Sequence, residues 1–378
     1  MKTLEFLNSF PTMDSALSSI KEKLGITARV YQEYGYAIVL LDYDQINSPK
    51  VDPIVIECRS LILSYTNKFE VLSRKFDRFF NYGEAHDYYK DFRIEESIVY
   101  EKLDGSLIGV WFNKFAKRWE ISTRGMAFAE GNHPMGGTFR EKVLSAFNTT
   151  DEHLQNIFND NFKTDWTIIF EYTGPENKVV TRYTESQMVI LGSRRNDGLE
   201  FIDLDRLQEK LDRLNVRTAR TYFGSDIDKI RELADSLPNL EEGFVILHPA
   251  TGKRMKLKSA TYVLAHRIRG NDTIPTRKNL LELVLTGETS EFLGYFPEWT
   301  ESVKSLENEV ETFLNNAQSA YDEFKHIEDQ KEFALNVKSV PGNQFIFRAR
   351  KSGCDSIKQA FFSDGVMPST RLKCFEQT

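Results

Sequence analysis

Short apolar runs alternate with turn-forming segments through the larger first part of the chain, and this pattern then gives way to a helical period. Up to about residue 266 the runs are rich in β-branched, aliphatic and aromatic residues, which strands prefer. From 303 to 327, apolar residues instead recur at intervals of three and four, and most positions between them are acidic or amide-bearing. The pattern therefore predicts a strand-rich part followed by an all-helical part.

The N-terminal region is predicted to hold one helix and three strands. Apolar residues from 13 to 24 follow a helical period, with Thr12 suited to cap the start and Gly25 to end the helix. Strand-like runs follow at 37–41, 54–63 and 69–72. In the second run Glu57 and Arg59 would share one face, because side chains repeat every two residues along a strand. Their charges would serve either a bound nucleotide or a cross-strand ion pair.

One lysine stands at the end of a strand-like run, directly before a turn. The run 98–100 leads to Lys102, Asp104-Gly105 forms a tight turn, and a second run follows at 107–112. Lys102 has mostly apolar neighbours and is therefore poorly placed for open solvent. Partial burial and nearby cations both lower the pKa of a lysine, and a neutral amine is a nucleophile. Lys102 is a candidate nucleophile on this basis; the alternative is a solvated lysine beside a hairpin turn.

Two later runs carry a carboxylate at or beside their ends. The run 166–172 is mostly apolar and ends in Glu171-Tyr172, and Glu242 stands before Gly243 and the apolar run that follows it. An acid at the end of an apolar strand is a better ligand candidate than one on a helix. For Glu171, a cap or a salt bridge is the alternative explanation.

Basic residues gather in three further segments. Residues 74–83 interleave cations with aromatics, which suits either phosphates and a stacked base or an aromatic core covered by arginine stems. The turn 123–125 could present Arg124, or the backbone of that residue, to an anion. In the run 254–259, alternation puts Lys256 and Lys258 on one strand face, where they repel each other unless an anion lies between them. A solvated edge strand is the alternative for these two lysines.

The amino-acid composition limits which partners the protein can bind and in which cellular compartment it is expected. The net charge of −7 argues against a protein that coats nucleic acid by bulk electrostatics, so any contact with RNA or polyphosphate must use a local basic patch. The three cysteines lie far apart and suit reduced thiols in a cytoplasm. No run approaches the roughly 18 apolar residues of a membrane span, and the first residues do not read as a signal peptide. A soluble cytoplasmic protein without a membrane partner is expected.

Taken in order, these segments resemble the covalent nucleotidyltransferase superfamily of ATP-dependent ligases and capping enzymes. Residues 102–105 (Lys-Leu-Asp-Gly) look like its nucleophile motif, and three later segments look like its third, fourth and fifth motifs, at 169–172, 242–245 and 256–258. Within the superfamily the chain is most similar to the phage-type RNA ligase 1 family, which residues 57–61 and 79–81 also resemble. The resemblance spans about 31–266. The chain departs from that family at Arg78, where lysine is common, and at Ser60, where glycine is usual.

The resemblance implies an α+β fold in two domains. An antiparallel-sheet nucleotidyltransferase (adenylylation) domain would occupy 1–265, and an all-helical C-terminal domain would occupy 266–378. It also implies ATP and Mg²⁺ as cofactors. DNA ligases and capping enzymes continue after the fifth motif into a β-rich OB domain, whereas the helical pattern here fits an RNA ligase 1.

Each candidate residue has a role that the resemblance implies. Lys102 would attack ATP and carry AMP, and Lys256 and Lys258 would neutralise charge on the α-phosphate. The remaining nucleotide contacts would come from Arg59, Arg78, Gly105, Glu171 and Glu242. The two arginines would bind phosphates, and the backbone near Gly105 would approach the nucleotide closely. The two carboxylates would hold Mg²⁺, although Glu171 could contact the ribose instead.

The function implied is joining of RNA 5′-phosphate and 3′-hydroxyl ends through a lysyl-AMP enzyme and an adenylylated RNA 5′ end. A monomer acting in RNA repair, for example of broken tRNA, is expected, in the host cytoplasm if the protein is phage-encoded. The alternatives are an ATP-dependent DNA ligase, a capping-type nucleotidyltransferase, or a non-catalytic RNA-binding relative.

Overall fold

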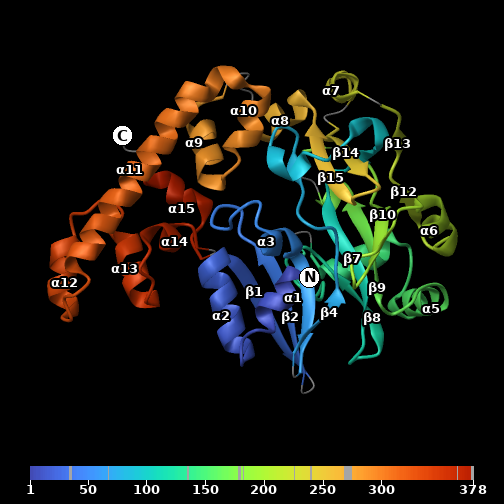
Figure 1. Ribbon diagram of the computed structural model, residues 1–378, viewed down its shortest axis with the longest axis horizontal. Helices are drawn as coiled ribbons and strands as arrows, with labels where there is room; N and C mark the ends of the chain where they lie inside the picture. The colour runs from blue at the N-terminus through green and yellow to red at the C-terminus, as the bar shows by residue number, and fades with distance from the viewer. Residues whose placement is uncertain are drawn as a thin grey trace. The chain divides into compact units, whose positions relative to one another are not determined.

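The structure is a computed structural model of the 378-residue chain (Figure 1). It describes residues 1–33, 36–66, 68–133, 136–177, 180–181, 183–224, 226–238, 241–267, 275–363 and 365–375. The chain groups into two compact units, unit 1 (1–44 and 48–266) and unit 2 (45–47 and 267–378). The assignment of domains to 1–265 and 266–378 stays a prediction.

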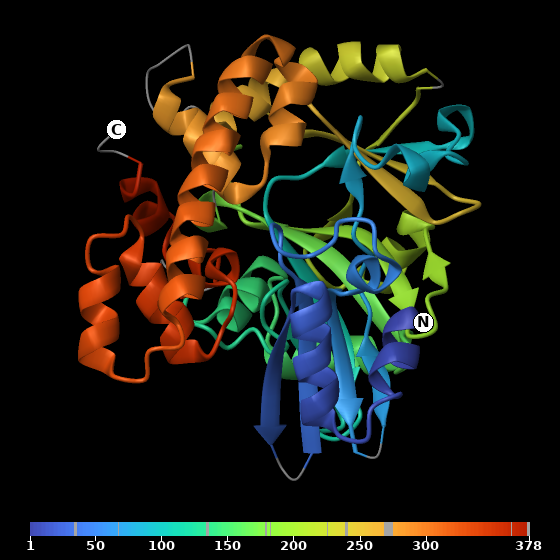
Figure 2. The same ribbon diagram turned by 60° about the vertical axis from the view of Figure 1, so that its left-hand side comes forward.

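An antiparallel sheet of four strands opens unit 1. Its order is β1 (Ile26–Glu33), β2 (Tyr36–Tyr43), β3 (Arg59–Tyr65) and β4 (Phe69–Ser73). Three helices supply apolar side chains to one face of this sheet: α1 (Lys2–Leu7), α2 (Met13–Leu24) and α3 (Pro53–Glu57). Figure 2 shows α2 lying along the strands. The predicted helix is confirmed, since Thr12 accepts a hydrogen bond from the Ser15 amide and Gly25 ends α2 at φ 63°.

The strand predicted at 54–63 is wrong in its first half. Asp52 caps a short helix that begins at Pro53, and both residue types favour a helix start. Glu57 ends that helix and accepts hydrogen bonds from the amide and hydroxyl of Thr3, at 2.8 and 2.7 Å. Only Arg59 lies on a strand, so the predicted shared strand face of Glu57 and Arg59 does not exist.

A second sheet forms the middle of unit 1. Its order is β11 (Glu200–Phe201), β10 (Gln187–Arg195), β9 (Trp166–Thr173), β7 (Ser106–Asn113) and β8 (Arg118–Ser122), all antiparallel, with β12 (Val216–Thr218) parallel to β10. A hydrophobic core cluster joins this sheet to α4 (Phe139–Ala146), α5 (Asp151–Asn161) and α6 (Leu204–Lys210).

The third sheet carries the predicted lysine strands. Its order is β13 (Thr221–Tyr222), β6 (Ile98–Lys102), β14 (Gly243–His248), β15 (Lys253–Lys258) and β5 (Phe80–Asn81), and only the β15–β5 pair is parallel. One face packs on α7 (Ile227–Asp235) through Ile230 and Ala234. The other elements of unit 1 are η1 (His86–Tyr89), η2 (Ile94–Glu96), η3 (Pro175–Asn177) and α8 (Ala260–Arg267). Antiparallel sheets with helices agree with the expected α+β class.

The hairpin predicted around Asp104-Gly105 is also wrong. Strand β6 pairs with β13 and β14, whereas β7 pairs with β8 and β9, so residues 103–105 carry the chain from the third sheet to the second. The Asp104 carboxylate holds this crossing in place. It accepts hydrogen bonds from the amides of Val180 and Thr181, at 2.7 and 2.8 Å, and from the Tyr262 hydroxyl at 3.0 Å. A local turn signal cannot distinguish a hairpin from a crossing held by partners so distant in sequence.

Unit 2 is helical over its described residues from 275 to 363 and from 365 to 375. Its elements are α9 (Arg277–Thr286), α10 (Thr289–Tyr295), η4 (Pro297–Trp299), α11 (Thr300–Phe324), α12 (Gln330–Val337), α13 (Asn343–Ser352), α14 (Ile357–Phe361) and α15 (Pro368–Lys373). The long helix predicted from 303 to 327 is confirmed as α11, with its apolar stripe buried. Among the described helices, none combines the length and the apolar character needed to cross a membrane.

One lysine is buried inside unit 1. Lys75 follows β4, and its Nζ lies 2.8 Å from the Ser60 hydroxyl oxygen. Burial lowers the pKa of Lys75 to about 7; nearby Asp42 opposes this shift and Arg59 reinforces it. The folded protein therefore favours the neutral amine over much of the alkaline range.

We predict that Gly243→Ala destabilises unit 1 strongly. Gly243 has φ +133°, and a Cβ atom there would lie 2.2 Å from the Leu257 carbonyl oxygen on the paired strand. Strain and overlap together should cost roughly 3 kcal/mol or more in the free energy of unfolding, measured by chemical denaturation. Gly252→Ala is the matched control: φ is +67° but no atom lies within 4 Å of the added Cβ. It should cost about 1–2 kcal/mol, and equal losses in the two variants would contradict the packing argument.

We predict a pH-dependent stability term from Lys75. The pKa of this lysine is about 7 in the folded protein, against its ordinary value of 10.5. Between these values the unfolded chain binds the extra proton, so the free energy of unfolding rises with pH, by up to about 1.4 kcal/mol per pH unit from this group. Denaturant unfolding at successive pH steps through this window should show that Lys75→Met lacks this slope. The exposed control Lys50→Met should keep it, and identical slopes in wild type and Lys75→Met would refute the prediction.

Candidate active site

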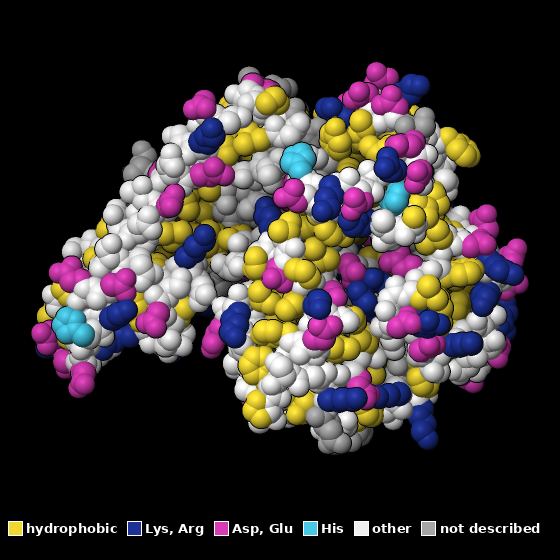
Figure 3. Space-filling view, viewed as in Figure 1, with side chains coloured by type: hydrophobic (Ala, Val, Ile, Leu, Met, Phe, Trp, Pro, Cys, Tyr) yellow, Lys and Arg dark blue, Asp and Glu magenta, His cyan; other side chains and the backbone are white. Residues whose placement is uncertain are grey.

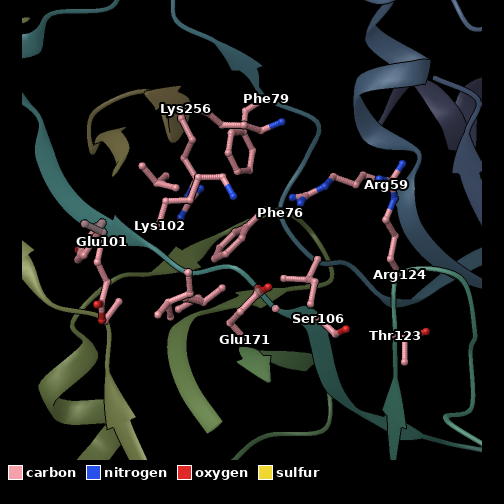
Figure 4. Close-up of a pocket in the computed structure, with 18 of the residues that line it drawn as sticks. Arg59, Phe76, Phe79, Glu101, Lys102, Ser106, Thr123, Arg124, Glu171 and Lys256 are labelled. Atoms are coloured by element: carbon pink, nitrogen blue, oxygen red, sulfur yellow. The ribbon is translucent and has the colours of Figure 1, made fainter. Parts of the chain in front are cut away.

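A cavity of about 520 Å³ lies in unit 1, and its walls come from residues of all three sheets and the segments between them. Six of the eight predicted site residues line it: Arg59, Lys102, Gly105, Glu171, Lys256 and Lys258. Figure 4 shows Lys102, Lys256, Arg59 and Glu171 reaching it from different elements. Residues that are far apart in the sequence thus meet around one space.

The register of the third sheet explains why the lysines converge. Lys102 is paired with Gly243, and Gly243 is paired with Lys258, so the three residues form one row across β6, β14 and β15. The next row on the same face contains Tyr100, Val245 and Lys256. Gly243 has no side chain, which leaves the space between Lys102 and Lys258 open.

A carboxylate lies between two of these lysines. Glu242 directly precedes β14 and is buried; its Oε2 is 2.5 Å from Lys102 Nζ and its Oε1 is 3.3 Å from Lys258 Nζ. This pairing neutralises part of the positive charge that the sheet face gathers. Glu242 is therefore in direct contact with the predicted nucleophile, although it does not itself line the cavity.

Glu171 is enclosed by protein except where it faces the cavity. It lies on β9 opposite Leu107 and Val189. Burial raises the pKa of Glu171 to about 8, with the charges of Glu242 and Asp104 adding to the shift and those of Lys102 and Arg59 opposing it. Near neutral pH this carboxyl group is therefore mostly protonated in the ligand-free protein. Binding of a cation beside it would favour the ionised form.

Arg59 begins β3, and its guanidinium group lies 5.0 Å from the centre of the Phe79 ring. Its Nη1 atom is buried and has no hydrogen-bond partner. Burial is also the main cause that lowers the pKa of Arg59. An unsatisfied guanidinium N–H beside a cavity is costly unless a ligand completes it, and phosphate oxygens match this donor. The arrangement fits an anionic ligand.

Gly105 lines the cavity where the chain crosses between sheets. A Cβ atom there would lie 2.3 Å from the Tyr172 carbonyl oxygen. The crossing therefore has no room for a larger residue, which agrees with the close backbone approach expected at this position.

Arg78 is not among the residues that line this cavity. It lines a second cavity of about 370 Å³, together with Asp77, Arg194 and Lys253, and Phe79 lines both cavities. Its guanidinium group lies 4.0 Å from the centre of the Tyr43 ring. The predicted partnership of Arg78 with Arg59 in one pocket is not seen, and a phosphate-binding role for Arg78 stays a prediction.

Three further ion pairs hold the cavity wall, and sequence reasoning missed all three. Glu101 pairs with Arg217 and, at 3.3 Å, with Arg220, which ties down the strand that ends in Lys102. Arg254 pairs with Glu200 at 2.7 Å and lies over Phe76. The partners come from distant segments, so the sequence carries no local signal for any of these pairs. Arg124, suggested as an anion contact, does line the cavity.

The predicted metal ligands could supply only part of the coordination shell of a metal ion. Glu171 and Glu242 are the two predicted ligands, and in the part of the chain that the structure describes no group of three His, Cys, Asp or Glu residues is arranged to hold a metal ion. Mg²⁺ commonly takes one or two carboxylates and completes its shell with water and substrate phosphates. The residues therefore fit a cation that arrives with a phosphate ligand, not one held in a protein cage.

Comparison with known proteins identifies relatives over most of the chain. A family model described as RNA ligase matches residues 57–262. The chain is 29% identical over 359 residues to the “Putative bifunctional polynucleotide kinase/RNA ligase” of Autographa californica nuclear polyhedrosis virus, covering 92% of this chain and 50% of that protein. It is 24% identical over 420 residues to the RNA ligase of Rhodothermus phage RM378, covering 93% and 92% of the two chains. The chain thus spans half the length of the baculovirus protein and nearly all of the phage protein.

Among solved structures, an archaeal ATP-dependent RNA ligase covers 86% of this chain and 86% of its own, with 14% identity and a TM-score of 0.47. The family model matches more than half of the chain, and its span contains every predicted site residue. The chain belongs to the RNA ligase family, as its motifs predicted.

Proposed function

We propose that the protein is an ATP-dependent RNA ligase that uses Lys102 to carry AMP. The observation that supports this most directly is the convergence of Lys102, Lys256, Lys258 and Arg59 on one cavity, with Glu242 against Lys102. A cationic cavity with an unsatisfied guanidinium donor suits a nucleoside triphosphate. The relatives' names supply the nucleic acid, RNA, that the geometry alone does not specify.

In the first step the Lys102 amine attacks the α-phosphorus of ATP. A nitrogen–phosphorus bond forms, the bond to pyrophosphate breaks, and the lysine loses a proton. Glu242 Oε2, 2.5 Å from Lys102 Nζ, can accept that proton. Lys256 and Lys258 neutralise charge that grows on the phosphate oxygens, and Arg59 binds phosphate through its free N–H. Glu171 and Glu242 would hold a divalent cation such as Mg²⁺, which would supply positive charge to offset that of the phosphates.

Two further transfers complete the reaction. The 5′-phosphate of an RNA end displaces Lys102 from the AMP, which forms a phosphoanhydride and frees the lysine. A 3′-hydroxyl then attacks the activated phosphate; the phosphodiester bond forms and AMP leaves. Each transfer keeps the charge near the same cations, so one cavity can serve all three steps.

The setting of the reaction is also part of the proposal. We assign residues 1–265 to the adenylyltransferase domain and 266–378 to the helical C-terminal domain of this ligase. RNA repair in the cytoplasm, by a monomer, remains the setting that we propose for it.

We predict that protein stripped of resident AMP with pyrophosphate becomes labelled by α-³²P-ATP and not by labelled GTP. Lys102→Ala should abolish the label because it removes the amine that is proposed to form the phosphoramidate, whereas the exposed control Lys90→Ala should be labelled like wild type. The readout is acid-labile radioactivity on the protein band. Label from GTP would indicate a capping-type enzyme, and no label at all would leave the non-catalytic RNA-binding alternative.

We also predict that Lys258→Ala lowers the rate of adenylylation by roughly 10²–10³-fold, since it removes one cation that faces the developing charge. Lys256→Ala should act in the same direction. The matched control is Lys253→Ala, on the same strand but against the Tyr88 carbonyl oxygen at 2.6 Å. Single-turnover labelling measures the rates. A Lys258→Ala rate equal to that of Lys253→Ala would remove Lys258 from the proposed mechanism.

A further inference from the structure

A buried lysine that the proposed mechanism does not use connects two arginine-bearing segments of the cavity. Lys75 Nζ donates to the Ser60 hydroxyl oxygen at 2.8 Å and to the Thr123 carbonyl oxygen at 3.4 Å. Ser60 directly follows Arg59, and Thr123 directly precedes Arg124. Both arginines line the cavity, and Figure 4 shows them on one side of it with Thr123 nearby.

Ser60 has an unusual backbone conformation for a residue with a side chain. Asp42 pairs with Arg59 while Leu41 pairs with Leu61, so Ser60 is the extra residue of a β-bulge, and its φ is +58°. A bulge of this kind normally favours glycine, because other residues meet steric strain at positive φ. The Ser60 hydroxyl donates to the Thr123 carbonyl oxygen at 3.0 Å. The side chain at this strained position therefore makes a specific link.

The aliphatic part of the Lys75 side chain occupies space that a side chain at Gly109 would fill. Gly109 lies on β7 beside it, and a Cβ atom at Gly109 would lie 2.5 Å from Lys75 Cε. The charged groups around the amine are Asp42, Arg59 and, through its hydrogen bond to Asp42 at 3.1 Å, Arg124. Burying an amine costs free energy that an apolar side chain in the same space would not. The hydrogen bonds that Lys75 makes are the reason we assign it a role.

We propose that Lys75 is a positioning residue for nucleotide binding: by holding Ser60 and the Thr123 carbonyl, it fixes the two backbone segments that present Arg59 and Arg124 to the phosphates. This inference rests on the proposed function. Lys75 does not touch the nucleotide itself. Its effect reaches the substrate only through the two arginines.

The test is a double-mutant cycle of Ser60→Gly and Lys75→Met, read by adenylylation at varied ATP concentration. Ser60→Gly removes the hydroxyl but suits the positive φ, so it should fold at least as well as wild type. Each single variant should raise the KM for ATP about tenfold or more with a smaller change in maximal rate. The double variant should lose no more than the worse single variant, because both changes break the same link.

Asn148→Gly is the matched control. Asn148 also has a positive φ, +55°, but is exposed and lies between α4 and α5, so its KM for ATP should equal that of wild type. A purely structural role for Lys75 would lower the active fraction and the melting temperature and leave KM unchanged.

Folded Ser60→Gly protein with the wild-type KM, or losses that multiply in the double variant, would overturn the proposal. Ser60→Gly alone decides the matter if Lys75→Met does not fold. Wild-type protein that takes no label from ATP would instead refute the proposed function, so the two failures are distinguishable.

Discussion

The cations that line the cavity repel one another, and the rest of the site depends on how negative charge offsets this repulsion. Lys102, Lys256, Lys258, Arg59 and Arg124 line one space in a protein whose net charge is −7. Figure 3 shows acidic and basic side chains interspersed over the visible face, so the cavity, not that face as a whole, concentrates positive charge. Glu242 offsets part of this charge through Lys102 and Lys258. A polyphosphate ligand would offset the rest, and this is the physical basis for proposing ATP.

The fold forces these cations together through strand register. Lys102 and Lys258 flank Gly243 across three strands, and any side chain at Gly243 would collide with the Leu257 carbonyl. The chain then leaves the third sheet directly after Lys102 and enters the second, which brings Glu171 to the same cavity. Asp104 fixes this crossing through three hydrogen bonds. A single crossing between two sheets thus joins the candidate nucleophile to the candidate carboxylate.

The sequence predicted well where a feature depends on local pattern. The period of apolar residues located α2, α11 and the strands that carry Lys102, Glu171 and Lys256. It failed where tertiary partners decide. The strand at 54–63 gave way to the cap and proline of α3, and the expected hairpin after Lys102 is a crossing between sheets.

Long-range contacts also explain what sequence reasoning missed at the site. Arg78 and Arg59 are both predicted to bind phosphates, but in the structure Arg78 lines a different cavity. The role of Lys75 depends on Thr123, a residue 48 positions away. From the sequence, Ser60 is recognisable only as a departure from the usual glycine, because the partners of its hydroxyl come together only in the folded chain. Such pairings require the structure, because neither member carries a pattern of its own.

In the proposed mechanism, one lysine both accepts AMP and passes it to RNA. The most direct test is a chase: adenylylated protein is isolated free of ATP, mixed with 5′-phosphorylated RNA that has a 3′-hydroxyl, and followed in a single turnover. We expect the label to leave Lys102, to appear briefly on the RNA 5′ end, and to be released as AMP while the RNA ends join. Label that stays on Lys102 in the presence of RNA, or that moves only to a DNA end, would contradict the proposed mechanism.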